Sequence, residues 1–267
     1  MAHDASSMNF VALLFFFLLA GHQVHADQVS FVREHDKLKQ LFQPVTEALG
    51  KTFEVVIDEE VYEAAGAEFD GQIYRVRVSR GLLRSPKLDL DTFRMILCHE
   101  VGHLFAGAPR RNLPPEWDGV IATDGRSLLS SEGQSDYYAA RGCFQMMSRN
   151  TISPPLNDVP LSIREKCETA WGERPPQVEM CLRSARAAKN FLRLTFDFPI
   201  DFDRPDLSHA GALIRDSYPA RQCRLDTFVQ AALCTDAPQL VWAAFDAGKS
   251  NCRTNPEAQR PRCWYVE

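Results

Sequence analysis

The sequence predicts an α+β protein, in which a small antiparallel sheet precedes two helices that carry a metal-binding motif. Residues 52–58 (TFEVVID) are apolar and β-branched, and residues 73–79 (IYRVRVS) alternate between apolar and charged side chains, as strands do. Helices are predicted over 91–106 and 131–147. Beyond residue 152, looser helical patterns accompany most of the eight cysteines. We therefore expect a helical, disulfide-bonded C-terminal part.

The start of the chain has the pattern of a signal peptide. Residues 10–20 (FVALLFFFLLA) form an unbroken apolar run that is too short to span a bilayer but fits the apolar region of a signal sequence. Val24-His25-Ala26 offers a small-residue cleavage site, so we expect residues 1–26 to be removed. No Lys or Arg precedes the run, and a retained anchor or a buried helix is the alternative. The expected location is secreted or periplasmic, with no stable membrane span after cleavage.

Charge and cysteine content limit the classes of function. The net charge is −5 and the basic residues are scattered, which argues against binding to nucleic acid or to an anionic membrane. Eight cysteines in an exported chain indicate disulfides. No C-x-x-C pair occurs, so a cysteine zinc site or a thioredoxin-like motif is disfavoured. We expect a monomer whose partner is a peptide or protein substrate.

The remaining elements are predicted from local patterns. A helix over 29–49 should be kinked or split at Pro44, and His35 on its apolar side is expected to be packed rather than to bind a metal. Asp70-Gly71 predicts a hairpin turn. Further helices are expected over 161–171, 177–194 and 224–233. Residues 27–152 and 153–267 should form one compact unit with a cleft between them.

The strongest functional signal is the motif His99-Glu100-Val101-Gly102-His103. Residues four apart on a helix project from nearly the same face, so His99 and His103 can bind one zinc ion. Glu100 would then reach a water molecule at the ion. Asp89 offers an N-capping oxygen to this helix, and Gly107 should end it.

A hydrolytic zinc site needs a third protein ligand and an open fourth position. The metzincin pattern would place a histidine at 109, where this chain has Pro109, so that class is excluded. Glu132 and Asp136 are one turn apart on the second predicted helix and can both face the first. Glu132 is expected to bind the metal, and Asp136 to accept a hydrogen bond from a ligand imidazole.

Over about residues 73–143, HEVGH followed by E-x-x-x-D resembles the gluzincins, the zinc metallopeptidases that include thermolysin-like and CAAX-protease-like enzymes. Small exported bacterial HExxH peptidases with EGQ(S/A)DY are similar as well. The resemblance implies a zincin helix pair with His99, His103 and Glu132 as ligands, Glu100 as general base and Asp136 behind a ligand histidine. Candidates for stabilising the oxyanion are Tyr137, Tyr138, Arg141, Tyr218 and His209. The resemblance to thermolysin-like enzymes points to His209 among them, and the alternative is that His209 is a surface histidine in a loop.

The expected function is that of an exported zinc-dependent metallopeptidase. Two alternatives stay open: a catalytically silent metal-binding or interaction module on a zincin scaffold, and a zinc amidase that acts on cell-wall crosslinks. The strand at 73–79 could be an edge on which an extended peptide pairs, or an ordinary strand. The loop at 108–130 is expected to form a lid or rim. Cys143 is expected to pair with the C-terminal half and not with Cys98.

Overall fold

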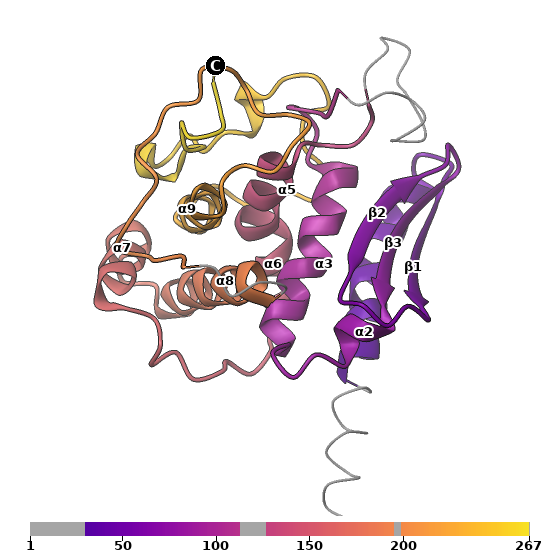
Figure 1. The fold of residues 1–267 in the computed structure, drawn as a ribbon, viewed down its shortest axis with the longest axis horizontal. Coiled ribbons are helices and arrows are strands. Elements are labelled where there is room, and N and C mark those ends of the chain that lie inside the picture. The colour runs from indigo at the N-terminus through magenta and orange to yellow at the C-terminus, as the bar shows by residue number, and fades with distance from the viewer. Residues whose placement is uncertain (1–29, 113–126, 195–198, 267) are drawn as a thin grey trace, which may run out of the picture.

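The computed structural model describes residues 30–112, 127–194 and 199–266, and it confirms the α+β class. A three-stranded sheet lies on one side of the long helix α3 (Leu90–Phe105), and the helices that follow α3 in the chain gather on the opposite side (Figure 1). The predicted signal peptide lies outside the described residues. None of the described helices is long and apolar enough to cross a membrane.

The sheet is mixed, which corrects the antiparallel sheet predicted from the sequence. Its strands are β1 (Thr52–Asp58), β2 (Ala65–Phe69) and β3 (Ile73–Ser79), in the spatial order β1-β3-β2. β3 pairs with β2 in antiparallel fashion and with β1 in parallel. The parallel pair arises because the chain crosses from β1 to the far edge before the hairpin brings β3 back between them. β3 is therefore the central strand, so of the two alternatives left open for residues 73–79 the structure supports the ordinary strand and not the edge.

The hairpin between β2 and β3 forms at the predicted turn. Oδ1 of Asp70 accepts hydrogen bonds from the backbone N–H groups of Gln72 and Ile73, at 2.9 and 2.8 Å. Gly71 adopts φ = 98°, a conformation that glycine reaches without steric cost. The short helix α2 (Arg80–Leu83) follows β3 directly and is capped by Ser79.

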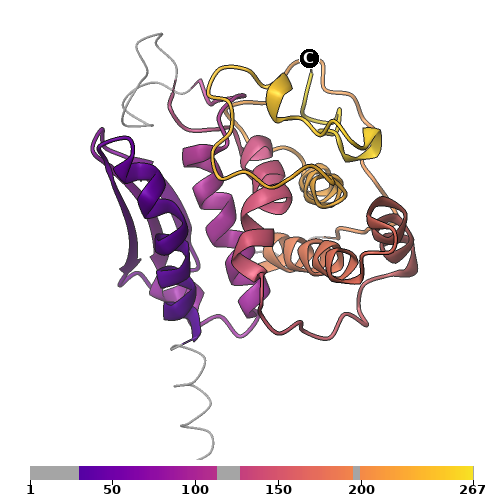
Figure 2. The same ribbon diagram turned by 180° about the vertical axis from the view of Figure 1, so that it is seen from behind.

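The N-terminal helix, over residues 30–47, covers the face of the sheet that is turned toward α3 (Figure 2). Its Phe42 lies 5.6 Å from the ring of Phe53 in β1 and 5.1 Å from that of Phe105 in α3. The helix continues through Pro44 and is not split, because Pro44 lies in its last turn. His35 is buried against Phe93 and lies away from the metal-binding motif, as predicted.

Helix α3 begins and ends close to the predicted positions. Oδ1 of Asp89 accepts a hydrogen bond from the backbone N–H of Thr92 at 2.7 Å, which satisfies one of the free donors of the first turn. Gly107 follows the last turn with φ = 67°. Nearly the whole helix is buried, so it forms the centre of the molecule.

The second predicted helix is present as three consecutive segments, α5 (Glu132–Tyr138), a π-helical turn (Ala139–Cys143) and α6 (Phe144–Ser148). It runs antiparallel to α3 and comes close to it at Gly102, where an added Cβ would lie 2.8 Å from Cα of Ser135. Because the helices are antiparallel, Cys98, which precedes Gly102, and Cys143, which follows Ser135, lie on the same side of this contact. They form a disulfide with a Cα–Cα distance of 5.4 Å. The prediction that Cys143 pairs with the C-terminal half is therefore wrong.

The C-terminal half is helical and disulfide-bonded, as predicted. It contains α7 (Leu161–Trp171), α8 (Pro175–Leu194), α9 (Arg221–Ala232) and the short 3-10 turns Gly248–Ser250 and Pro256–Ala258. α9 begins three residues before the predicted start, so Cys223 lies inside it. The other disulfides are Cys167–Cys181, Cys223–Cys263 and Cys234–Cys252. Four disulfides are typical of proteins in an oxidising, extracellular environment.

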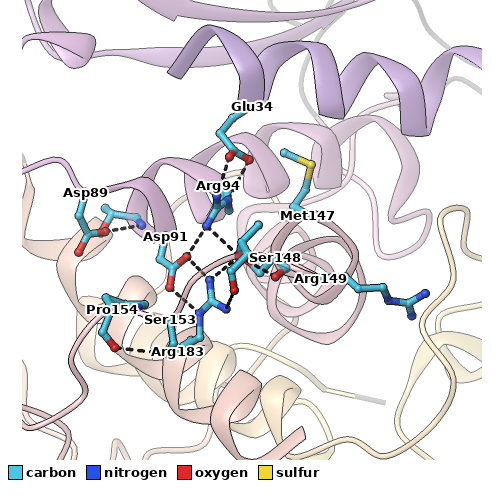
Figure 3. Close-up of polar contacts among 12 residues, drawn as sticks. Glu34, Asp89, Asp91, Arg94, Met147, Ser148, Arg149, Ser153, Pro154 and Arg183 are labelled. Carbon is cyan, nitrogen blue, oxygen red and sulfur yellow. Dashed lines mark hydrogen bonds and ion pairs between the residues drawn. The ribbon is translucent and has the colours of Figure 1, made fainter. Parts of the chain in front are cut away.

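A buried ion network joins the two halves at the N-terminal end of α3 (Figure 3). Arg94 binds Glu34 of the N-terminal helix through two hydrogen bonds, at 2.8 and 2.5 Å, and binds Asp91 at 2.7 Å. Arg183 of α8 binds the same Asp91 at 2.8 and 2.7 Å. Two arginines and two carboxylates thus neutralise one another, which is how charges are tolerated in a protein interior.

Candidate metal centre

The two predicted ligand histidines and Glu132 come together where α3 packs against the start of α5. Nε2 of His99 lies 3.2 Å from Nε2 of His103 and 3.2 Å from Oε2 of Glu132. Oε1 of Glu132 is 3.6 Å from Nε2 of His103. All three side chains are buried, and their ligand atoms lie within 4.8 Å of one another. This group could therefore hold a metal ion.

The hydrogen-bond partners of the imidazoles fix which ring nitrogens are available. Nδ1 of His103 lies 2.8 Å from the carbonyl oxygen of Ser130, which can only accept a hydrogen bond, so Nδ1 carries the proton. Nδ1 of His99 lies 2.8 Å from Oδ1 of Asp136. The two atoms are not aligned for a hydrogen bond, but the neighbouring carboxylate favours the proton on Nδ1 of His99. In neutral rings both Nε2 atoms then present lone pairs to the same point.

The electrostatics of this point favour a cation. Two imidazole lone pairs converge there with the carboxylate of Glu132, whose Oε2 is buried without a hydrogen-bond partner. Burial opposes protonation of His99, but Asp136 and Glu132 outweigh it and raise its pKa to about 9. Burial lowers the pKa of His103 to about 3.

Asp136 is held in place by a residue that the sequence did not reveal. Arg224 of α9 makes two hydrogen bonds of 2.7 Å to the carboxylate of Asp136, and both side chains are buried. Planar, bidentate pairs of this kind fix the orientation of a carboxylate as well as its charge. The Asp136 carboxylate thus contacts His99 through one oxygen while Arg224 fixes its plane.

Glu100 follows His99 on α3 and lines the adjoining cleft. Its side chain is buried, and burial raises the pKa of its carboxyl group to about 7. A carboxylate with its pKa near neutrality can both accept and return a proton in the pH range in which most proteins work. Glu100 therefore has the environment of a general base, beside the ligand atoms of the candidate metal centre.

A cleft of about 570 Å³ opens over His99 and Glu100. Its walls come from the start of β2, from α2, from the C-terminal end of α8 and from the segment that leads into α9. Among its lining residues are Ala65, Ile96, Phe191, Tyr218 and Arg224. The cleft thus lies between elements of the N-terminal and the C-terminal halves, which agrees with the prediction from the sequence.

The predicted oxyanion donor His209 is not at this site. His209 is exposed and lines a different cavity, together with Phe202, Asp226 and Arg262. It was favoured by analogy alone, and its position in the fold could not be read from the local sequence. Tyr137, Tyr138 and Arg141 donate hydrogen bonds to backbone carbonyls elsewhere. Of the candidate donors named from the sequence, Tyr218 is the one that lines the cleft.

Two further groups of potential ligand atoms are less suitable for a metal ion. One combines Asp206 with Cys223 and Cys263, and the other combines Asp236 with Cys234 and Cys252. In each group the two cysteines are joined in a disulfide, so no thiolate is available. Among the described residues, His99, His103 and Glu132 are thus the group of potential metal ligands whose donor atoms are all intact.

Searches against protein-family models, curated proteins and solved structures find no match to this chain. The features that indicate a function are therefore the geometry of the site and the motif at residues 99–103.

Proposed function

We propose that the chain is a zinc-dependent metallopeptidase. The observation that carries this proposal is the convergence of His99 Nε2, His103 Nε2 and Glu132 Oε2 beside a cleft that Glu100 also lines. Two imidazole nitrogens and one carboxylate oxygen, with a further position left for water, are a ligand set found in catalytic zinc sites. A purely structural zinc site is usually closed by four protein ligands and needs no carboxylate beside it.

Glu100 would move the proton in the reaction. A zinc ion held by the three ligands would polarise the scissile carbonyl and make a water molecule more acidic. The carboxylate of Glu100 accepts a proton from this water while the water oxygen attacks the carbonyl carbon. When the carbon–nitrogen bond breaks, Glu100 returns the proton to the leaving amine.

Tyr218 is our candidate for stabilising the oxyanion. Its side chain lines the cleft with His99 and Glu100, and the residue is 67% exposed, so its hydroxyl can turn toward a bound substrate. The guanidinium of Arg224 lies 5.1 Å from the Tyr218 ring centroid, which holds the ring beside the ligand-bearing helices. A phenolic O–H directed at a developing negative charge lowers the barrier to acyl transfer.

The edge of the sheet supports a peptide as substrate. The backbone N–H of Ser79 donates to the carbonyl of Ala64 at 2.9 Å, and bonded pairs recur at every second residue of an antiparallel ladder. Ala65 and Ala67 therefore turn their own N–H and C=O groups away from β3, toward the outer edge of β2, which pairs with no other strand among the described residues. Ala65 lines the cleft. An extended peptide can pair with such an edge through its main chain.

We further propose that the protein is exported. The four disulfides agree with an oxidising compartment, and the signal-peptide pattern of residues 1–26 favours secretion or the periplasm. We propose that the mature protein works there as a monomer.

The experiment compares purified protein with the variant Glu100→Gln, using Glu165→Gln on the exposed side of α7 as a matched control. Wild type should contain about one zinc ion per chain and cleave an unstructured protein such as casein. Glu100→Gln should keep the zinc and lose cleavage by on the order of a thousandfold or more, because it lacks the general base. Metal-free wild-type protein would contradict the site. Zinc binding without any cleavage would favour the silent binding module.

A further inference from the structure

We propose that Arg111 is a positioning residue that restricts Glu132 to a single donor oxygen at the metal centre. This inference rests on the metal site proposed above and adds the control of its coordination. Arg111 belongs to the segment that follows α3, and no sequence motif connects it with Glu132.

The backbone fixes where Arg111 lies. The N–H of Arg111 donates to the carbonyl of Leu129 at 2.9 Å, and the N–H of Ser131 donates to the carbonyl of Pro109 at 3.0 Å. Arg110 and Ser130 form an antiparallel bridge between these two bonds. The segment that carries Arg111 is thus paired with the residues that immediately precede Glu132, so the two side chains meet because of the local fold.

The two oxygens of Glu132 have different surroundings. Nη2 of Arg111 donates to Oε1. Oε2 is buried without a hydrogen-bond partner and lies 3.2 Å from Nε2 of His99. Nη2 of Arg224 is 3.8 Å from Oε2, beyond hydrogen-bond distance. Oε1 is therefore bound by the guanidinium of Arg111, and Oε2 is available to bind a metal ion.

This asymmetry has a consequence for coordination. A carboxylate that uses both oxygens occupies two positions around an ion, whereas one that uses a single oxygen leaves a position for water or for the substrate carbonyl. With Oε1 bound to Arg111, Glu132 offers only Oε2. The positive charge of Arg111 also weakens the donor strength of the carboxylate, which lowers metal affinity and makes a bound ion a stronger Lewis acid.

A simpler role for Arg111 would be to neutralise Glu132 only until a metal ion binds. In that case the guanidinium would leave Oε1 on metal binding, and its removal would not alter the coordination of the bound ion. The two roles therefore differ in a spectroscopic property of the metal-loaded protein, which does not depend on catalysis.

The test uses Co²⁺ in place of zinc, because the visible absorption of Co²⁺ weakens as its coordination number rises above four. Spectra and dissociation constants are measured for wild type, Arg111→Met, Arg111→Lys and the control Arg110→Met. The side chain of Arg111 is 21% exposed, so these substitutions leave the core intact. Arg110 is the control because it carries the same charge in the same segment but lies over a different residue. Its Cζ is 5.3 Å from the ring centroid of Phe245.

We expect Arg111→Met to weaken the absorption and to tighten Co²⁺ binding by on the order of tenfold, because loss of the nearby positive charge outweighs the looser carboxylate. Arg111→Lys should retain most of the wild-type spectrum and affinity, and Arg110→Met should retain both. A wild-type spectrum in Arg111→Met, or weaker Co²⁺ binding by it, would overturn the role proposed for Arg111. Absence of Co²⁺ binding in wild type would instead contradict the proposed metal site.

Discussion

Arg224 and Asp136, which are 88 residues apart in the chain, form a buried bidentate ion pair with two hydrogen bonds of 2.7 Å. Oδ1 of Asp136, which accepts one of these bonds, also lies 2.8 Å from Nδ1 of the candidate ligand His99. A helix of the C-terminal half thus supports the ligand set on the N-terminal half. Because of this contact, the candidate metal centre depends on both halves of the chain.

Asp136→Asn should lower zinc affinity by roughly 10–100-fold, because a neutral amide no longer fixes the Nδ1 proton of His99 as firmly. The matched control is Asp236→Asn, which disrupts the ion pair between Asp236 and Arg141, 2.7 Å long and also buried. Chelator competition measures the affinity. Equal zinc affinities in the two variants would show that Asp136 acts only on stability.

Gly102 is predicted to be required for the close approach of the two ligand-bearing helices. In Gly102→Ala the new Cβ would lie 2.8 Å from Cα of Ser135, so the helices must separate. Overpacking of this kind costs roughly 1–3 kcal/mol in the free energy of unfolding. Gly66→Ala on β2 is the control, since nothing lies within 4 Å of its added Cβ. Urea unfolding should separate the two variants, and equal losses of stability would contradict the argument.

The buried ion network at the N-terminal end of α3 is predicted to contribute strongly to the free energy of unfolding. Asp91→Asn leaves Arg94 and Arg183 with too little negative charge in a buried site, and removal of one partner there costs about 3–5 kcal/mol. Asp158→Asn breaks the ion pair with Arg186, in which the Asp158 side chain is 59% exposed. The expected loss in the free energy of unfolding is about 0–1 kcal/mol for such an exposed pair. The free energies of unfolding should differ accordingly. Similar values for the two variants would show that the buried network adds little to stability.

His35 predicts a pH dependence of stability. Burial lowers its pKa from 6.5 to about 4, so the unfolded chain binds a proton between these pH values and the folded chain does not. Stability should therefore fall as the pH drops from 6.5 to 4, by up to about 3 kcal/mol from this residue. His35→Phe should remove this contribution, which is measured by urea unfolding at both pH values. Parallel losses in wild type and variant would contradict it.

The parts of the fold that depend on local signals were predictable from the sequence. The bounds of α3 follow from the cap at Asp89 and the stop at Gly107, and the hairpin follows from Asp70-Gly71. β2 was missed because AGAEF has no β-branched residue and gains its strand structure only by pairing with β3. The parallel pairing of β1 with β3 is likewise a non-local property.

In the candidate site, too, the residues that follow from local spacing were predictable and those that depend on the tertiary fold were not. Helical spacing brought His99 and His103 together, and a second helical spacing placed Glu132 and Asp136 on one face. Arg224 was not predictable, because its contact with Asp136 depends on the path of the C-terminal half. The disulfide between Cys98 and Cys143 was mispredicted because the antiparallel course of the two helices was not known. The assignment to the gluzincins stays a prediction.

X-ray absorption at the zinc edge of the purified protein tests the central claim most directly, because it reports the atoms that surround the ion. The account predicts a first shell of nitrogen and oxygen donors at roughly 2.0–2.1 Å, with the scattering pattern of two imidazoles and no sulfur. His99→Ala should remove one of the imidazoles or the zinc itself. A sulfur shell near roughly 2.3 Å, or a purified protein without zinc, would contradict the account.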